Sequence, residues 1–445
     1  MMSSTRSWYR ISLLHIGTLL SFYCTAQSGS DSSVLRNASL DQVIQYALQH
    51  QPALKQSVID EQIVETTLRN KLSAWYPQLN FNYSLQHNFQ VPTNIIGGNP
   101  IRLGVNNTSN AQFAFSQNIF NRDVLLANRS KEDVRTQARQ NTAINKVEVV
   151  TNVSKAFYDV LATIQQIKVA DENIIRIQNS LKVALSQYKA GIADKTDYKR
   201  ATILLNNTKA TRASNQSVLD AKTSYLKNLM GYPDSTSLDI SYDSLLLEKE
   251  INLDTIQQPD ITKIPEFVFL RTQQKLLYAS LQYEKWAFLP QVSLNGGYNF
   301  NYLNNQFGKL YSNNFPSSFA VLTLSFPLTQ GGKRNANIDQ VNWQIKRNAL
   351  DILQFGQTVN TQYAQALAAY KSSYSNYIAL KENLELAREV YGVIDLQYKA
   401  GVKTYLEVIT AETDLRTSQI NYYNALYLVL ASKVDVKRAL GQINY

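Results

Sequence analysis

Gln187-Tyr188-Lys189-Ala190-Gly191 recurs in this chain as Gln397-Tyr398-Lys399-Ala400-Gly401, at an offset of 210 residues. The same offset relates Leu229-Met230-Gly231 to Ala439-Leu440-Gly441, and upstream Tyr76-Pro77-Gln78-Leu79 has a counterpart in Leu289-Pro290-Gln291-Val292. A period this long exceeds the roughly 20–50 residues of a solenoid unit. The repeat therefore indicates a duplicated half-protein, whose two halves should build related structures.

Each repeated pentapeptide ends a long segment that is poor in helix breakers. Glycine is absent between Gly104 and Gly191, and proline is absent after Pro327. Such segments predict long helices over residues 122–189 and 334–399, of 68 and 66 residues. At about 1.5 Å per residue, each would be roughly 100 Å long.

The apolar residues of these segments follow a heptad pattern, which predicts coiled-coil packing. In the first long helix the series is Val150, Val153, Phe157, Val160, Ile164, Ile167, Ile174, Leu181, Leu185 and Tyr188. Beyond the repeated glycine of each half the chain should turn back through helices 194–230 and 403–440. The second of these carries its own seam, at Val408, Ala411, Leu415, Ser418, Tyr422, Ala425 and Val429.

Two further helical segments, added to the return helices, match the length of the long helices. One covers residues 39–75 and starts with a capping box of Ser39 and Gln42, and the other covers 261–288. With the return helices they make pairs of 74 and 66 residues, close to the long helices. We therefore expect two shorter helices, stacked end to end, beside each long one.

Four alternating segments lie between the helices, at 78–92, 108–119, 290–302 and 317–328. Their length suits strands that cross a bilayer at a tilt, and the loops within each pair are rich in Asn, Gly and Ser. A soluble sheet with one buried face is the alternative for any single segment. Because four strands cannot close a lumen and open edges are not tolerated in lipid, a membrane role requires an oligomer.

The domain organisation follows from these elements. Residues 1–26 predict a secretory signal peptide, with Arg6 and Arg10 before an apolar run. Cys24 could indicate a lipoprotein, but bulky Tyr23 precedes it where a small residue is needed. The first repeat would span 27–231, an inter-repeat linker 232–260 and the second repeat 261–445. The linker, together with the C-terminal tail, is expected to wrap the middle of the helices.

Composition argues against several classes of function. Loss of the signal peptide would remove the only cysteine, and with it any thiol or disulfide chemistry, and lower the net charge from +10 to +8. The remaining Lys and Arg are scattered among acids, which does not favour nucleic-acid binding. Only His50 and His87 would remain, and neither has metal-ligand spacing, so we expect no metal, no cofactor and no enzymatic activity.

The chain resembles the TolC family of outer-membrane efflux and export channels over essentially the whole mature sequence. The resemblance rests on a set of motifs that occur in the same order and spacing. The motifs are Ser39-Leu40-Asp41 with His50-Gln51-Pro52, Pro77-Gln78-Leu79, Phe326-Pro327-Leu328-Thr329-Gln330-Gly331-Gly332, and Gly401-Val402-Lys403-Thr404-Tyr405-Leu406-Glu407-Val408. The resemblance implies a mainly α fold with transmembrane β: a long coiled-coil helical barrel, and four strands per protomer in a shared twelve-stranded barrel of a homotrimer. It also implies an outer-membrane location extending into the periplasm, with a periplasmic adaptor and an inner-membrane transporter as partners.

The resemblance further assigns roles at the hairpin ends. Tyr398 would pair with Asp197, and Lys403 with Thr196, to close a periplasmic gate, where lysine replaces the more usual arginine. Glu407 would narrow the pore as part of an acidic ring, although Thr410 stands where a second acid is usual. The adaptor would dock on two tips, Ala190-Gly191-Ile192 and Ala400-Gly401-Val402. Asp197 and Glu407 also lie near helix N-termini, where acids are favoured regardless of gating, and the two glycines could simply stop helices.

Two functions remain open at this point. The first is a passive conduit that completes a tripartite efflux pump or a type I secretion system, with outer-membrane lipid around its strands. The second is a periplasmic coiled-coil scaffold or adaptor whose sheet is soluble. The two differ in whether the strands lie in a membrane.

Overall fold

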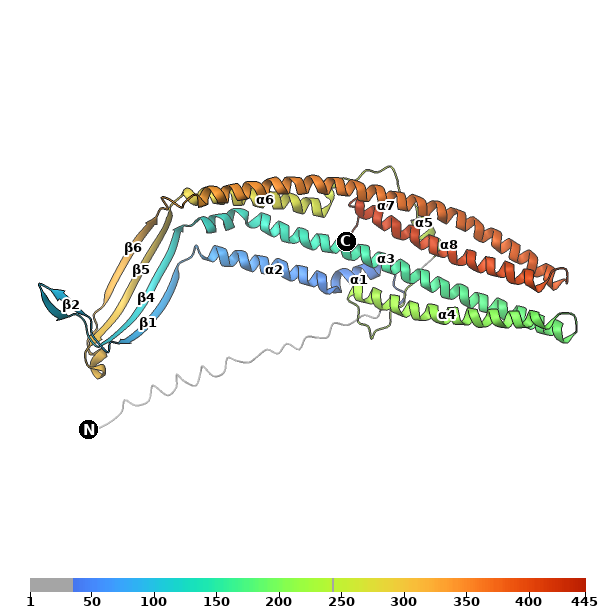
Figure 1. Ribbon diagram of the computed structural model, residues 1–445, viewed down its shortest axis with the longest axis horizontal. Coiled ribbons are helices and arrows are strands. Elements are labelled where there is room, and N and C mark those ends of the chain that lie inside the picture. The colour runs from blue at the N-terminus through green and yellow to red at the C-terminus, as the bar shows by residue number, and fades with distance from the viewer. Residues whose placement is uncertain (1–34, 242–243) are drawn as a thin grey trace, which may run out of the picture.

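The computed structural model describes residues 35–241 and 244–445. The molecule is elongated, with a β-sheet at one end, two helical hairpin tips at the other, and helices aligned with the long axis between them (Figure 1). The expected signal peptide, residues 1–26, and Cys24 within it lie outside the described residues.

Two long helices run along the molecule, α3 (Arg122–Lys189) and α7 (Lys333–Lys399), with 68 and 67 residues. Beside α3 lie α2 (Pro52–Ser73) towards the sheet and α4 (Lys195–Met230) towards the tip. Beside α7 lie α6 (Pro265–Lys285) and α8 (Tyr405–Ala439) in the same order (Figure 1). The expected stacking of two shorter helices against each long one is confirmed.

The single helix expected over 39–75 is wrong, because the chain breaks at Gln51 into α1 (Leu40–His50) and α2. Gln51 has φ −58° and ψ 121°, outside the helical region, and Pro52 occupies the first turn of α2. A proline there lacks only an N–H that would be unpaired anyway, but it forces the preceding residue into an extended conformation. The α6 helix begins in the same way at Pro265, after a short 3₁₀ turn at Ile261–Lys263.

Gly231 ends α4 in the left-handed conformation, with φ +68°, directly against the junction between α1 and α2. A Cβ at this position would lie 2.7 Å from the carbonyl oxygen of His50 and 3.0 Å from the Cα of Gln51. Gly191 has a similar φ of +72°, but nothing lies within 4 Å of its Cβ position. Substitutions at the two glycines therefore separate two costs: the clash with neighbouring backbone, present only at Gly231, and the left-handed backbone conformation, present at both.

We predict that Gly231→Ala lowers the free energy of unfolding by about 2–5 kcal/mol, since a left-handed alanine costs about 1–2 kcal/mol and the backbone clash adds about 1–3. Gly191→Ala should lose only the first contribution. Guanidinium unfolding of the detergent-solubilised proteins measures the difference. Equal losses in the two variants would show that the packing of α4 on the α1–α2 junction is not tight.

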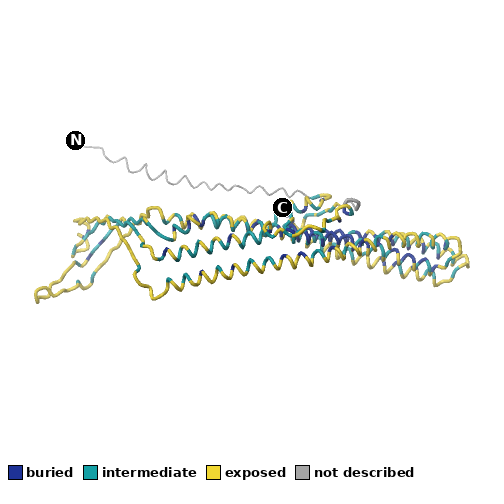
Figure 2. Tube along the Cα trace, turned by 90° about the horizontal axis from the view of Figure 1, so that it is seen from above, coloured by how far each residue is buried: buried dark blue, intermediate teal, exposed yellow. Residues whose placement is uncertain are grey.

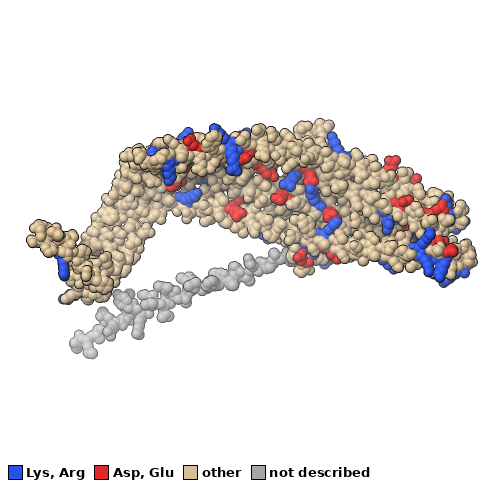
Figure 3. All heavy atoms as spheres, in the orientation of Figure 1, with Lys and Arg blue, Asp and Glu red and all other residues tan. Residues whose placement is uncertain are grey.

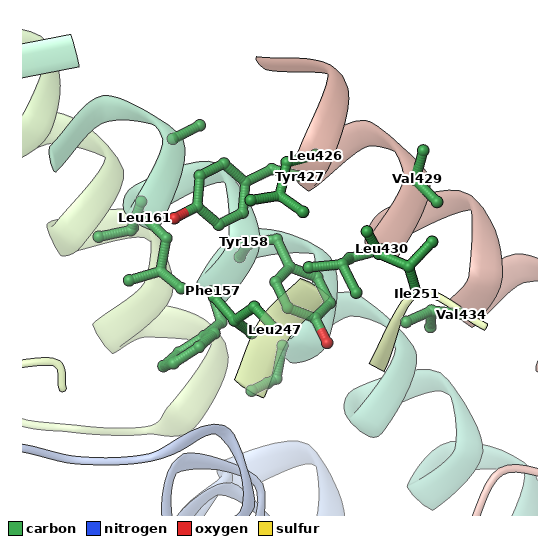
Figure 4. Packing of buried hydrophobic residues seen from close by; sticks show 14 of the residues in the cluster. Phe157, Tyr158, Leu161, Leu247, Ile251, Leu426, Tyr427, Val429, Leu430 and Val434 are labelled. Carbon is green, nitrogen blue, oxygen red and sulfur yellow. The ribbon is translucent and has the colours of Figure 1, made fainter. Parts of the chain in front are cut away.

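The core lies in the half of the molecule that carries the hairpins, where buried residues are concentrated, while the sheet end is largely exposed (Figure 2). There Phe157 and Leu161 of α3 pack with Leu426 and Leu430 of α8 and with Ile251 of the linker (Figure 4). The seam expected on α8 is confirmed: all its members are buried except Ser418, which is half-buried.

The seam expected on α3 holds from Val150 to Ile167 and then changes register. Beyond that point the buried residues of α3 are Val169, Ala170, Asn173, Ile177, Ser180 and Ala184, whereas Leu185 and Tyr188 are exposed. Two heptad positions of the predicted series are polar, Asp171 and Gln178, so the apolar pattern is interrupted in this region. The buried face there combines Ile177 with the polar or small residues Asn173, Ser180 and Ala184, so a search for large apolar residues misses most of it.

The four long strands form one antiparallel sheet in the order β1-β4-β5-β6. They are β1 (Gln78–His87), β4 (Asn107–Phe120), β5 (Gln291–Asn304) and β6 (Ser317–Ser325). The first strand ends at His87 and not at residue 92, and the following loop contains a small hairpin, β2 (Thr93–Ile96) and β3 (Asn99–Arg102), that the sequence did not indicate. Gly97 and Gly98, both with positive φ, form its turn.

The register separates apolar from polar side chains on the two faces of the sheet. Phe81 lies opposite Phe113, which lies opposite Tyr298, and Leu294 lies opposite Leu322. On the other face, Asn82 donates a hydrogen bond to Gln112, and Asn295 contacts Thr323. Phe319 and Val321 are apolar exceptions on the polar face. Both edge strands, β1 and β6, are exposed along their whole length.

The linker between the repeats is tied to the middle of α7 and α8. It contains the short helix α5 (Ser244–Glu250). After α5, two of its backbone carbonyls accept hydrogen bonds from tyrosines that lie seven positions apart on α7. Tyr363 donates to the carbonyl of Gln257, and Tyr370 donates to that of Ile251 at 2.9 Å. Glu248 pairs with Lys381 at 2.7 Å and also accepts from Tyr422 of α8. The wrapping expected of this segment thus rests on a row of tyrosine hydroxyls.

Candidate functional site

The residues that the sequence singled out gather at the hairpin end of the molecule. There Tyr398 and Tyr405 form a small separate core with Ala201 and Val408, their rings 5.7 Å apart between centroids. Both tyrosines are buried, with 6% and 2% of their surface exposed. The core joins α4, α7 and α8 just behind the two tips.

Tyr398 reaches across to the first hairpin. Its hydroxyl donates a hydrogen bond to Oε1 of Gln187 on α3, at 2.8 Å. Burial, followed by the charge of Asp197, raises the pKa of Tyr398 above its usual value. Asp197 is therefore close enough to act on the tyrosine through its charge, but among the described residues the bonded acceptor is Gln187.

Gln187 is a residue that the sequence reasoning missed. It is the first residue of the repeated pentapeptide, so its position was conspicuous, but no role was assigned to it. Its amide oxygen accepts the hydrogen bond from the Tyr398 hydroxyl, and neither group carries a charge. Together with Asp197 it gives Tyr398 two polar neighbours on the first hairpin.

Lys403 and Glu407 pair with each other. The Lys403 ammonium lies 2.6 Å from Oε1 of Glu407, and the other carboxylate oxygen accepts hydrogen bonds from the backbone N–H and the hydroxyl of Thr404. These contacts, led by Lys403, lower the pKa of Glu407 to about 2. Glu407 thus caps α8, in agreement with the helix-terminus interpretation of this acid.

Thr196 lies in the first turn of α4, where its backbone N–H donates to Oδ1 of Asp194 at 2.7 Å. Within the residues that the structure describes, the side chain of Lys403 contacts Glu407 and does not reach Thr196. Within the described residues, a single chain therefore places Tyr398 near Asp197 but bonded to Gln187, and does not pair Lys403 with Thr196.

Both tips project freely. Ile192 and Val402 are 77% and 72% exposed, and the backbone turns at Gly191 and Gly401 have φ of +72° and +75°. The N–H of Ile192 bonds back to the carbonyl of Gln187, and that of Val402 to the carbonyl of Gln397, both at 2.9 Å. This is the helix ending that glycine favours. Each tip thus presents one apolar side chain on a rigid turn.

A buried carboxylate lies further up the helices. Glu412 on α8 is 1% exposed, and its nearest cation is Arg176 of α3, 3.8 Å away. Neither carboxylate oxygen has a hydrogen-bond partner within the described part of the chain. Burial raises the pKa of Glu412 to about 7, with Arg176 and Arg416 acting in the opposite direction and Asp395 adding to the rise. The sequence held a signal for this group, since Glu412 lies at helical spacing between Val408 and Leu415 on the buried face.

The two histidines of the described residues lie far apart in the fold. His50 at the end of α1 stacks on Tyr46, and His87 at the end of β1 is exposed and bonds to Asn107. No group of three His, Cys, Asp or Glu residues in 35–241 and 244–445 could hold a metal ion. In the same residues, no helix is long and apolar enough to cross a membrane.

Comparison with known proteins gives one consistent result. The sequence profile of the family described as "Outer membrane efflux protein" matches residues 43–232 and 268–442. The chain is 21% identical to Outer membrane protein TolC of Escherichia coli K12 over 432 residues, covering 93% of this chain and 84% of that protein. It is 20% identical over 415 residues to Cation efflux system protein CusC of the same strain, covering 90% and 85%.

Solved structures share the fold. A crystal structure of CusC superimposes with a TM-score of 0.72 at 18% identity, covering 92% of this chain and 95% of the other. The outer membrane protein VceC of Vibrio cholerae gives a TM-score of 0.70 at 13% identity, covering 90% and 96%. Since the profile matches most of the chain, in both repeats, this protein belongs to the Outer membrane efflux protein family.

Proposed function

We propose that three copies of this chain form an outer-membrane exit duct that completes a tripartite export assembly. The observation that carries the proposal is the sheet: one face is mainly apolar, the other is mainly polar, and within the described residues the outer edges of β1 and β6 pair with no other strand. A sheet with open edges cannot remain in lipid, so β1 of one copy must pair with β6 of the next. Three such sheets supply twelve strands, within the range of membrane barrels.

The faces assign the two sides of that barrel. Leu79, Phe81, Leu322 and Leu324 are 59–69% exposed in a single chain, a cost that contact with lipid removes. The asparagines and glutamines of the opposite face would line a water-filled lumen. A soluble scaffold would leave this apolar face in water, so the sheet favours the membrane duct over that alternative.

The helices extend the duct through the periplasm. The length of α3, 68 residues, corresponds to roughly 100 Å, and the tips at its far end are the part that an adaptor would reach. The bond between Tyr398 and Gln187 supports a gate that ties α7 to α3, and Lys403 with Thr196 would add a contact made between neighbouring copies. Glu407 would place a carboxylate from each copy at the mouth.

Transport through such a duct is passive. Energy would come from an inner-membrane transporter, and the adaptor would connect the two proteins. The chain itself would catalyse no reaction.

Cell fractionation tests the proposal. We expect the protein in the outer membrane and, after detergent extraction, in a particle with three times the mass of the mature chain. A monomer recovered from the periplasmic fraction would contradict the proposal.

A further inference from the structure

The two tips, although related by the repeat, differ in charge. Residues 182–200 contain five cations and two acids, a net charge of +3, whereas residues 392–410, at the offset of 210, contain two of each. The cations of the first tip are Lys182, Lys189, Lys195, Lys199 and Arg200. The duplication has thus produced one basic tip and one neutral tip.

The charges of the neutral tip are internally paired. Lys399 lies 2.7 Å from Asp395, and Lys403 lies 2.6 Å from Glu407. Each cation therefore has an acid four residues away on its own chain segment. This tip therefore presents little unpaired charge to a partner protein.

At the basic tip, the acids are engaged elsewhere. Asp194 caps α4 by accepting the backbone N–H of Thr196, and Asp197 lies towards Tyr398 and Tyr405, whose pKa values it helps to raise. All five cations are exposed, and within the described residues none of them forms an ion pair or a side-chain hydrogen bond. Figure 3 shows Lys and Arg gathered at this end of the molecule, beside α4.

Helix energetics do not account for most of these cations. Lys195 is the first residue of α4, where the helix dipole favours acids over bases, and Lys199 and Arg200 follow in the second turn, where the dipole does not stabilise a cation. Of the five, Lys189 in the last turn of α3 has the position that the dipole favours. Close to them, Ile192 is 77% exposed on the turn. An apolar residue surrounded by charged ones is the composition of a protein interface, with an apolar centre and a polar rim.

We propose that the tip of the first repeat docks a periplasmic partner protein through an acidic surface of that partner, whereas the tip of the second repeat meets its partner without net charge. This inference rests on the proposed function and adds to it the chemistry of the partner and the inequality of the two docking sites. Unpaired cations at the tip would steer the partner and fix its register, so that it recognises the first repeat.

The first step of the test identifies the partner. A photo-crosslinking amino acid is placed at position 192 or 402 of the full chain in cells. The partner protein that becomes crosslinked is identified, and it is then purified on its own for use as the probe. Carbodiimide treatment of the reconstituted complex then joins lysines to carboxylates. We expect products from Lys195 or Lys199 to Asp or Glu of the partner, and none from Lys399 or Lys403.

The second step reverses the charge. The triple variant Lys195→Glu, Lys199→Glu, Arg200→Glu should weaken binding of the purified partner at least about tenfold and remove most of its salt dependence. It should fold normally, since glutamate suits the start of α4. The control is Lys55→Glu, Lys71→Glu, Lys275→Glu, which makes the same change of charge at exposed positions on α2 and α6 and should bind as the parent does.

The outcomes separate this inference from the proposed function. If the reversed variant binds the partner as tightly as the control, the acidic partner surface is refuted and docking itself stands. If neither position 192 nor 402 crosslinks to any protein, docking at the tips is refuted as well. If the reversal weakens binding only to phosphatidylglycerol vesicles, the basic tip recognises a lipid surface, which also overturns the inference.

Discussion

Replacing Tyr398 by phenylalanine raises the single-channel conductance of the reconstituted protein in planar bilayers. The change removes one hydroxyl, the donor of the 2.8 Å bond to Gln187, and leaves the buried ring in place. Such a bond contributes about 1 kcal/mol. If the three copies open together, the closed state loses about 3 kcal/mol, which corresponds to an increase of about 150-fold in the ratio of open to closed states.

Two further variants distinguish the acceptors of this hydroxyl. Gln187→Ala should reproduce most of the increase, whereas Asp197→Ala alone should have a smaller effect, because that carboxylate acts on the tyrosine only through its charge. Added to Tyr398→Phe, the Gln187 change should give little more, since both remove the same bond. Unchanged conductance in Tyr398→Phe would refute the gate at this position.

The stability of the helical region should fall as the pH rises from about 4.5 to about 7, because of Glu412. Its pKa is raised from 4.5 to about 7 in the folded protein, so between these values the unfolded chain ionises while the folded one must stay protonated. The stabilisation is therefore complete below pH 4.5 and lost above pH 7. A shift of this size corresponds to about 3 kcal/mol per chain.

Glu412→Gln should abolish this pH dependence, since glutamine does not titrate. Arg176 keeps Glu172 as a neighbour, at 3.9 Å, and lies 3.4 Å from Gln419, so the variant does not leave an isolated buried cation. Guanidinium unfolding at pH 5 and pH 8 measures the effect, with the exposed Glu389→Gln as the control. A parent protein equally stable at both values, or a variant that retains the difference, would show that Glu412 is not kept protonated by burial.

The elements of this fold that could be predicted were those encoded by punctuation and repetition. The absence of proline and glycine indicated the extent of α3, the absence of proline indicated that of α7, and the repeated Lys-Ala-Gly located both hairpin tips. The alternation of Val292, Leu294 and Tyr298 with polar residues located β5 and its two faces. These signals are local, and the structure follows them.

The features that escaped prediction depend on contacts distant in sequence or on small residues. After the change of register at Asn173, the buried face of α3 has Ser180 and Ala184 beside Ile177, so its hydrophobic signal is weak. The bond from Tyr398 to Gln187 joins residues 211 positions apart, and the family pattern directed attention to Asp197 instead. The tie from Glu248 to Lys381 and Tyr422 likewise appears only once the linker is placed beside α7 and α8.

The duct exists only if the free edges of neighbouring sheets pair. The most direct measurement is disulfide formation between Asn82→Cys in β1 and Thr323→Cys in β6, residues that share the polar face of the sheet. Neighbouring positions along each strand should be scanned for register. The predicted result is a ladder of linked dimers and trimers from outer-membrane fractions in at least one register. Exclusively monomeric protein in every register would contradict the shared barrel.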